Sequence, residues 1–261
     1  MKVILTGSSS FIGRRLLAKL ESCGHVVISI GRNETVRWKL GEDIPTFEDA
    51  SVLIHLAYDR SRNLSDSIHD SELIINSFSG KIIYLSSMSA HSKAKSSYGR
   101  RKYAEECLFM SAGASVLKAG LVIGPDAEGV FGKLRLLVER LPIIPVLMRG
   151  RPLFYISQIE NLLNEINHVL ISSKSGIIRA SSKAPLSLKE IIKQIASGLG
   201  DSKRLILLPK YPIHFVFVLL RIFSSRPHLI DSYFSITEEI SAQEVENLLP
   251  PSTEFADFNL K

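Results

Sequence analysis

Tyr98 and Lys102 have the residue types and the spacing for acid–base chemistry. They stand four residues apart in a segment with a helical pattern, so both side chains would lie on one face of a helix. An ammonium group beside a phenol stabilises the phenolate, and a phenol whose ordinary pKa is about 10 then becomes a usable acid and base near neutral pH. We therefore predict a catalytic pair, against the alternative of a solvated helix pair.

A glycine-rich turn near the N-terminus would bind phosphate groups. The segment Thr6–Gly13 reads TGSSSFIG, follows a strand pattern and opens a helical pattern, a context typical of turns that bind a pyrophosphate at a helix N-terminus. Gly7 permits the tight turn and Gly13 permits close packing, whereas Ser10 replaces the middle glycine. The alternative is an ordinary serine-capped helix start. The predicted dinucleotide-binding residues of this turn are Gly7, Ser9, Ser10, Phe11, Ile12 and Gly13.

Arg32 bears on which dinucleotide would bind. It follows the second strand pattern, where an acidic residue would bind the ribose hydroxyls of NAD. A guanidinium instead pairs with the 2′-phosphate of NADP(H), which a carboxylate would repel. We predict NADP(H) as the preferred cofactor, with NAD(H) also allowed. The alternative is a solvated arginine at the start of a loop.

Short apolar runs alternate with longer helical patterns along the first half of the chain. This alternation predicts an α/β fold with a doubly wound parallel sheet, Rossmann-like, in which helices fill the gaps between strands. The predicted strands are Lys2–Thr6, Val26–Ile30, Val52–Ala57, Lys81–Ser87 and Ser115–Ala119. Later helical patterns cover residues 130–141, 158–170, 186–199 and roughly 240–249.

Composition excludes several classes of protein. The net charge is +6, yet Lys and Arg are spread along the 261 residues with no basic block, so we predict no nucleic-acid partner. Cys23 and Cys107 lack metal-ligand spacing, and His55, His69, His91 and His214 share none either. We predict neither a disulfide framework nor a metal site.

Two features bear on location. The first strand pattern begins at Lys2, which leaves no room for a signal peptide, and we predict a cytoplasmic protein. The most apolar stretch, residues 212–223, is interrupted by charged residues and lies next to prolines, so it falls short of a transmembrane segment. It reads as a buried helix, with a membrane-contacting or partner-binding helix as the alternative.

The motifs resemble those of the extended short-chain dehydrogenase/reductase family, the NAD(P)-dependent epimerase/dehydratase group that acts largely on nucleotide sugars. TGSSSFIG resembles the family's TGxxGFIG, Val52–Ala57 resembles its strand VIHLA, and Tyr84–Ser87 and Tyr98–Lys102 followed by Glu106 match its active-site pattern. Residues 116–125 resemble its LRPxxVYGP segment, and residues 244–251 resemble a C-terminal segment that ends in two prolines. The resemblance covers most of the chain.

The resemblance implies roles for individual residues. Tyr98 would be the acid/base, Lys102 would orient the nicotinamide ribose and lower the pKa of Tyr98, and Ser87 would bond the substrate oxygen. An ungapped count puts Asn63 at the family's helix asparagine, a further catalytic residue. Leu56 and Ala57 would contact the cofactor. Homodimers of the family often form through a four-helix bundle that includes the helix carrying Tyr98.

The resemblance also implies a division of the chain. Residues 1–122 and 152–182 would form the NAD(P)-binding domain, and residues 123–151 and 183–261 would be substrate-facing segments, with a small, mainly helical C-terminal lobe. Arg151 would hold the diphosphate of a nucleotide-sugar substrate, although a solvated basic loop explains it equally well. The sequence departs from the family at Ala90–His91–Ser92, at Lys118 in place of arginine, and at Ser157–Gln158 in place of an acidic pair.

The residues after Ser87 limit the reaction. Sugar dehydratases of the family have an acidic pair there because elimination of water needs a second acid/base, but this chain has Met88 and Ser89. The remaining reactions are reduction of a keto sugar by NADPH, which we favour, and epimerisation with retained NAD. A hypothesis from another class is a non-catalytic NADP(H)-binding sensor or scaffold protein.

Overall fold

The computed structural model describes residues 1–146, 153–200, 203–207 and 254–255. The strands of the main sheet are β1 (Lys2–Thr6), β2 (Val26–Gly31), β3 (Val36–Arg37), β4 (Ala50–His55), β5 (Lys81–Ser87), β6 (Ser115–Ala119), β11 (Gly176–Ala180) and β14 (Glu254–Phe255). The helices around it are α1 (Phe11–Ser22), α2 (Leu64–Ser77), α3 (Ser97–Ser111) and α5 (Ile159–Ile171).

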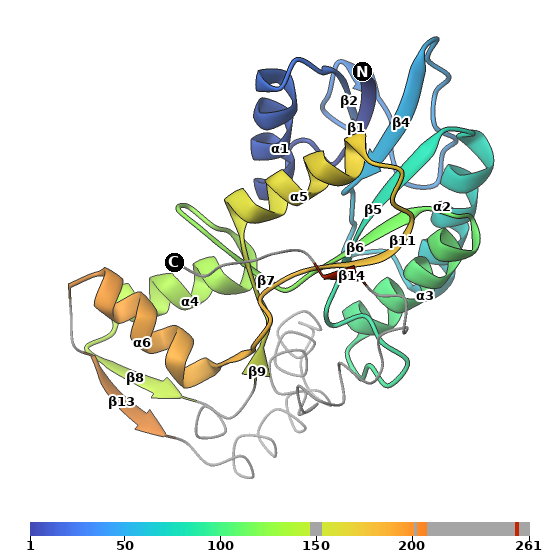
Figure 1. Ribbon diagram of the computed structural model, residues 1–261. Helices are drawn as coiled ribbons and strands as arrows, with labels where there is room; N and C mark the ends of the chain where they lie inside the picture. The colour runs from blue at the N-terminus through green and yellow to red at the C-terminus, as the bar shows by residue number, and fades with distance from the viewer. Residues whose placement is uncertain (147–152, 201–202, 208–253, 256–261) are drawn as a thin grey trace.

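The main sheet is parallel, with the strand order β14-β11-β6-β5-β4-β1-β2-β3 (Figure 1). Apolar side chains of α1 and α5 pack on one face, and those of α2 and α3 pack on the other. In β1, Val3, Ile4 and Leu5 are fully buried, as a strand between two helical layers requires. The predicted doubly wound, Rossmann-like fold is confirmed.

The direction of winding changes at β1. This strand pairs with β2 on one side and with β4 on the other, so the connections that follow the two strands leave in opposite directions. Doubly wound sheets bind ligands in the crevice at the carboxyl ends of their strands, where the order reverses. The glycine-rich turn after β1 and Leu56–Ala57 after β4 both lie at this point.

The predicted end of the third strand was wrong by two residues. We expected a strand over Val52–Ala57, but β4 ends at His55. The N–H of Leu56 is shared between Thr6 Oγ1 at 3.1 Å and the Thr6 carbonyl at 3.3 Å, and the N–H of Ala57 donates to Thr6 Oγ1 at 3.1 Å. Backbone pairing therefore gives way to the Thr6 side chain at these two residues. This bends the chain out of the sheet beside the glycine-rich turn.

The prediction that helices fill every gap was also wrong between β2 and β4. That connection contains the short strand β3 and turns instead of a helix. Trp38 and Ile44, which are 4% and 3% exposed, cover the sheet there and join the core formed with α2 and α3. Gly41, with a φ of 95°, and Pro45 explain why the segment does not continue as a helix.

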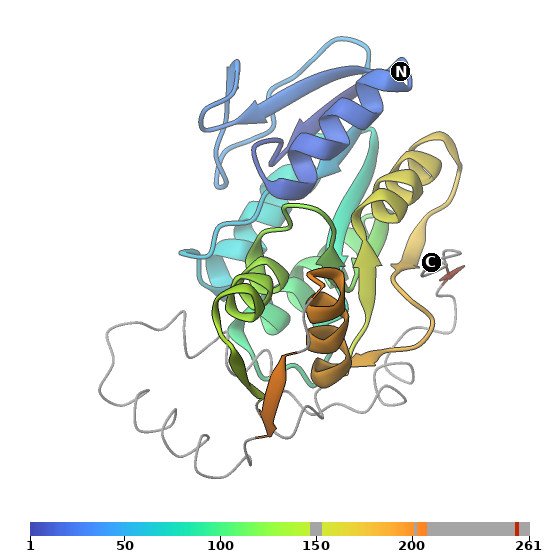
Figure 2. The ribbon, with the colours of Figure 1, turned by 90° about the vertical axis from the view of Figure 1, so that its left-hand side faces the viewer.

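A second, smaller core lies away from the main sheet. It is formed by β7 (Leu121–Ile123), α4 (Gly129–Arg140), β8 (Ile143–Val146), β9 (Leu153–Phe154), β10 (Ile156–Gln158), β12 (Leu186–Ser187), α6 (Leu188–Gly198) and β13 (Arg204–Leu207). Figure 2 shows α4 and α6 packed together beside the pair β8 and β13. The predicted helices 130–141, 158–170 and 186–199 are confirmed as α4, α5 and α6 within two residues.

Two predicted segments, residues 212–223 and roughly 240–249, lie outside the described residues. In the part of the chain that the structure describes, none of the helices has the length and apolar character needed to cross a membrane.

Replacing Thr6 with Val should destabilise the fold by about 3 kcal/mol, because the N–H of Ala57 and the ring of His55 would lose their buried hydrogen-bond partner. Urea unfolding of the two proteins measures this difference. Thr6→Ser is the matched control, since it keeps the hydroxyl and loses one methyl group worth about 1 kcal/mol. Equal losses in the two variants would contradict the assigned role of the hydroxyl.

Candidate active site

The glycine-rich turn has no room for larger residues at two positions. Gly7 has a φ of 72°, and a Cβ there would lie 2.8 Å from the backbone nitrogen of Ala57. A Cβ on Gly13 would lie 2.1 Å from the carbonyl oxygen of Gly7. Both glycines are therefore required by the close approach of the turn to its neighbours, as predicted from the sequence. This leaves bare backbone at the N-terminus of α1.

Ser10 begins α1 as its N-cap residue. Its hydroxyl accepts the N–H of Gly13 at 3.0 Å, which satisfies a donor that the first helical turn leaves unpaired. The serine-capped start considered above is thus present, and it explains why a serine is accepted at the glycine position. Phe11 and Ile12 supply the leading N–H groups of the helix, and the carbonyl of Ser9 accepts a hydrogen bond from Arg14. Binding of a dinucleotide by this turn stays a prediction.

Thr6 fixes the protonation of His55. Because Thr6 Oγ1 accepts two backbone N–H groups, its own proton is donated to Nδ1 of His55 at 2.8 Å, which leaves the imidazole proton on Nε2. Burial, followed by the nearby Lys102 charge, lowers the pKa of His55 to about 3. His55 is therefore a neutral structural residue at the carboxyl end of β4, next to the candidate site.

Two side chains of opposite charge stand where the β2 end meets the glycine-rich turn. Arg32 is 75% exposed, and its guanidinium lies 3.7 Å from the Asp59 carboxylate. Glu34 accepts a hydrogen bond of 2.6 Å from the Ser8 hydroxyl, inside the glycine-rich turn. The sequence pattern drew attention to Arg32 alone, because an acidic residue three positions after the strand matches no simple motif. Both residues bear on which dinucleotide this edge accepts.

Tyr98 lies in the first turn of α3, beside the segment that follows Ser87. Ser96 caps this helix by accepting the N–H of Gly99 at 3.1 Å. A Cβ on Gly99 would lie 2.5 Å from the carbonyl oxygen of Ser89, so the helix start packs directly on the loop after β5. The Ser87 hydroxyl accepts the N–H of Ser89 at 3.2 Å in that loop. The strand carrying Ser87 and the helix carrying Tyr98 therefore meet, as predicted.

Lys102 is buried among polar groups that the sequence did not single out. Its ammonium donates to the Tyr84 hydroxyl at 2.9 Å and to the Leu85 carbonyl at 3.3 Å, and it lies 3.3 Å from the Glu105 carboxylate. Tyr84 in turn donates a short hydrogen bond to Glu105. Burial disfavours ionisation of Glu105, but the charge of Lys102 and the Tyr84 bond outweigh it and lower the pKa of Glu105. Lys102 and Glu105 thus form a buried ion pair in which each charge compensates the other, and Tyr84 is hydrogen-bonded to both.

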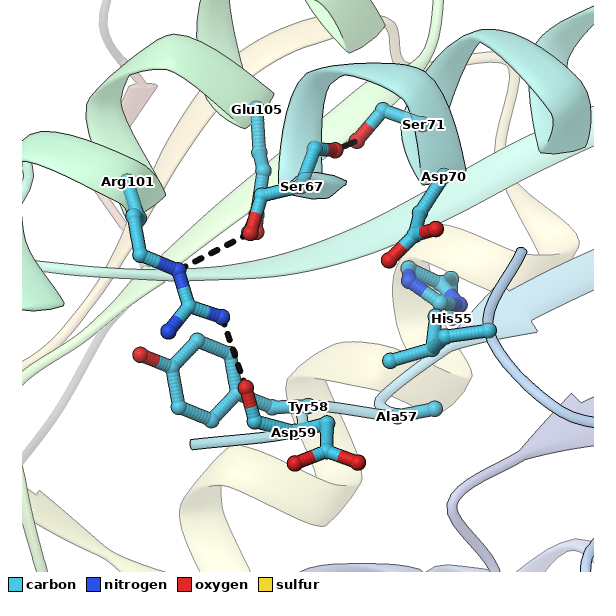
Figure 3. A pocket seen from close by; sticks show the side chains of 10 residues that line it. His55, Ala57, Tyr58, Asp59, Ser67, Asp70, Ser71, Arg101 and Glu105 are labelled. Carbon is cyan, nitrogen blue, oxygen red and sulfur yellow. Dashed lines mark hydrogen bonds between the residues drawn. The ribbon is translucent and has the colours of Figure 1, made fainter. Parts of the chain in front are cut away.

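Tyr58 connects the two predicted catalytic side chains. Its ring lies edge-on to the Tyr98 ring, with centroids 5.2 Å apart, and the Lys102 ammonium lies 5.0 Å from its centroid. Arg101 covers the same ring at 4.6 Å and donates to the Ser67 hydroxyl and to the Asp59 carbonyl, as the dashed lines in Figure 3 show. Tyr58 follows Leu56–Ala57 directly, so the segment after β4 faces both the glycine-rich turn and α3.

Asn63 is the N-cap residue of α2. Asn63 is exposed at the start of α2, where its side chain accepts the N–H of Asp66 at 2.9 Å and its own N–H donates to the Asp66 carboxylate at 3.1 Å. This capping box explains the residue without chemistry. Its catalytic role stays a prediction. The predicted substrate residue Arg151 lies outside the described residues.

The departures from the family pattern have local explanations. Lys118, which replaces an arginine, forms a buried ion pair with Glu106 at 2.7 Å and also donates to the Ala90 carbonyl. The Ser86 hydroxyl donates to the same carboxylate at 2.6 Å. His91 is buried beside this group, and burial, followed by the charge of Lys118, lowers its pKa to about 4. Among the described residues, His, Cys, Asp and Glu side chains form no group of three suited to a metal ion.

Comparison with known proteins identifies the fold. No protein-family model matches the chain, and no curated protein matches it. Its structure is nevertheless similar to many solved ones. The UDP-glucose 4-epimerase of Thermotoga maritima, solved with UDP-glucose, is 17% identical, and the match covers 80% of this chain and 86% of that one with a TM-score of 0.65. The chain shares the doubly wound, Rossmann-like fold of these enzymes.

Two further similar structures differ in their reactions. The dTDP-4-dehydrorhamnose reductase of Yersinia enterocolitica is 20% identical, covers 79% of this chain and 83% of its own length, and has a TM-score of 0.63. TunA, an NAD-dependent NDP-hexosamine 5,6-dehydratase involved in tunicamycin biosynthesis, is 14% identical over 80% and 85% of the two chains, with a TM-score of 0.66. The same fold is thus found in an epimerase, a reductase and a dehydratase. The fold alone therefore does not distinguish among these three reactions.

Burial of neutral His55 should make the fold less stable in mild acid. Its pKa of about 3 lies below the value of about 6.5 in an unfolded chain, so the unfolded state binds more protons between these values. The stabilisation is complete above about pH 6.5, and about 2 kcal/mol of it is lost on acidification to about pH 5. Urea unfolding at both pH values measures the loss.

His55→Gln should remove the His55 share of this pH dependence, whereas His69→Gln, at an exposed position, should leave the dependence as in the wild type. His91 is expected to contribute a similar share of the dependence over the same range. An unchanged loss in His55→Gln would contradict the assignment of a neutral, buried His55.

Proposed function

We propose that this protein is an NAD(P)-dependent oxidoreductase that acts on a nucleotide sugar and reduces a keto group, with Tyr98 as the general acid. The observation that best supports this function is that Tyr98 and Lys102 both lie beside the Tyr58 ring, on a helix whose start packs on the loop that follows Ser87. The nucleotide-sugar enzymes of the same fold give independent support for the substrate class.

The turn fits a dinucleotide on structural grounds. A side chain at Gly7 or Gly13 would collide with backbone, so the turn keeps its backbone bare where a pyrophosphate would approach. The residues that would hold the cofactor are those of the turn together with Leu56 and Ala57, which Thr6 holds against it. When bound, NADPH supplies the hydride that reduces the carbonyl carbon.

The chain's own residues would handle the carbonyl oxygen. The Ser87 hydroxyl would donate a hydrogen bond to that oxygen and so orient the keto group. Tyr98 would transfer its phenolic proton to the oxygen as the carbon is reduced, which gives the alcohol and leaves a tyrosinate. The Lys102 ammonium, four residues further along α3, would stabilise the tyrosinate until it is reprotonated from solvent.

Epimerisation with retained NAD is the alternative, and Glu34 favours it. Its carboxylate lies on the glycine-rich turn through the Ser8 hydrogen bond, where it would accept the ribose hydroxyls of NAD and repel a 2′-phosphate. Arg32 favours NADPH, since a guanidinium pairs with that phosphate. A non-catalytic sensor or scaffold protein would need the turn but would have no use for Tyr98, Lys102 and Ser87 together.

Tyr98→Phe should lower the rate of reduction by about a hundredfold to ten-thousandfold, because the variant has no proton to transfer. The rate is measured as NADPH oxidation with a panel of 4-keto nucleotide sugars. Cofactor affinity, measured by fluorescence titration, should change little. Tyr103→Phe, on the same helix, is the control and should keep most of the activity. If Tyr98→Phe retains the biological function of the protein, the sensor or scaffold interpretation replaces the enzyme.

Arg32 and Glu34 should act in opposite directions on cofactor choice. Arg32→Ala should weaken NADPH binding by about tenfold to a hundredfold, as loss of a charged hydrogen bond predicts, and leave NADH binding unchanged. Glu34→Gln should strengthen NADPH binding and weaken NADH binding. Fluorescence titrations with both cofactors give the dissociation constants, and Arg37→Ala, at another exposed arginine nearby, controls for general charge effects.

Tight, non-exchanging NAD in the purified protein would support the epimerase instead. Equal effects of Arg32→Ala and Arg37→Ala on NADPH would contradict a specific role for Arg32.

A further inference from the structure

Glu105 is a buried charged residue beside the candidate site, and the proposed function gives it no role. It is buried one helical turn after Lys102 on α3, and it contacts the ammonium that the proposed function assigns to stabilising the tyrosinate. Its carboxylate also accepts the hydrogen bond of Tyr84 from β5. A carboxylate placed here opposes the effect of the lysine, because it compensates the positive charge on which that stabilisation depends.

We propose that Glu105 is a positioning residue that sets the acidity of the catalytic tyrosine by compensating the charge of Lys102. This inference rests on the proposed function of Tyr98 and Lys102 and deepens it. The same buried group would keep Tyr98 protonated to a higher pH than Lys102 alone would allow. A protonated phenol is the form that a reductase needs, since the tyrosine must give its proton to the substrate oxygen.

Geometry supports this role over a purely structural one. The Lys102 ammonium has three polar partners, the Tyr84 hydroxyl, the Leu85 carbonyl and the Glu105 carboxylate, so it is held in one position. Its distance to Tyr58 brings it to the same ring that the Tyr98 phenol contacts. Glu105 is therefore coupled to Tyr98 through one fixed cation rather than through a mobile surface lysine.

The other charged and titratable groups nearby are accounted for. His55 on β4 is neutral, and Tyr84 on β5 is held protonated because burial and then Glu105 raise its pKa. Figure 3 shows the rest around a cavity of about 10 Å³, room for about one water, that also touches Glu105. Asp70 on α2 is paired with Arg62, and Arg101 donates to Ser67 and to the carbonyl of Asp59. The Asp59 carboxylate faces Arg32 instead.

The test is the ionisation of Tyr98, which needs neither cofactor nor substrate. Ultraviolet difference spectra between a protein and its Tyr98→Phe variant, recorded against pH, report the tyrosinate of this residue alone. In Glu105→Gln the midpoint should fall by about one pH unit relative to the wild type, because the Lys102 charge is no longer compensated. The pH above which the reduction rate declines should fall by the same amount.

Tyr84→Phe is the matched control. It removes the hydrogen bonds that Tyr84 makes with Glu105 and with Lys102 but keeps both charges, so the midpoint should stay close to that of the wild type. If Glu105→Gln does not fold in dilute buffer, the same titration in sucrose, which favours the folded state, with the wild type measured in the same solution, should show the same fall.

The outcomes separate this inference from the proposed function. An unchanged or higher midpoint in the folded variant lacking Glu105 would overturn the role of Glu105, even if the enzyme is active. A lower midpoint in a protein that never oxidises NADPH would support the role of Glu105 and leave the proposed reaction wrong. Equal shifts in Glu105→Gln and Tyr84→Phe would also overturn the proposal, because hydrogen bonding rather than charge would then set the acidity.

Discussion

The burial of the Lys102 charge constrains everything around the candidate site. A buried ammonium is costly unless it is paired and hydrogen-bonded, and here its partners come from two elements: Glu105 from α3, and Tyr84 and Leu85 from β5. These contacts fix α3 against the sheet at the position that places Tyr98. The lysine required by the chemistry thus also dictates which polar residues the core beside it must contain.

A second buried ion pair, between Glu106 and Lys118, lies beside the first and has the same need for polar partners. Glu106 lies next to Glu105 in sequence but pairs with Lys118 on β6, so the two adjacent carboxylates pair with cations on different elements, α3 and β6. The Ser86 hydroxyl donates to Glu106, and the Tyr84 hydroxyl donates to Glu105. Two alternate residues of β5 therefore hold α3 against the sheet by hydrogen bonds. The loop after β5 is held as well, because Lys118 also bonds the Ala90 carbonyl.

The residues of the candidate site that could be predicted are those with a local sequence pattern, such as glycines in a tight turn or two side chains four residues apart on a helix. Gly7 and Gly13 were predicted to stand where the backbone is close, and neither position admits a Cβ. Tyr98 and Lys102 were selected because their spacing places both on one helical face, and their catalytic roles stay a prediction. Tyr58 and Glu34 could not be assigned, since each depends on how the chain crosses between strands rather than on a local pattern. The absence of a helix between β2 and β4 was not predicted for a related reason. Trp38 and Ile44 cover the sheet there without a helical spacing of apolar residues.

The absence of a helix between β2 and β4 also affects the cofactor edge. A short turn after β2 leads into β3 at the sheet edge. In this turn Glu34 accepts a hydrogen bond from the Ser8 hydroxyl, while Arg32 lies near Asp59. With a longer helical connection, a residue three positions after the strand would already be leaving the crevice along the helix. The shortened connection therefore places an acidic and a basic side chain at the same edge. Under the proposed function, cofactor choice would depend on the balance between the two charges, and not on one motif residue at the end of β2.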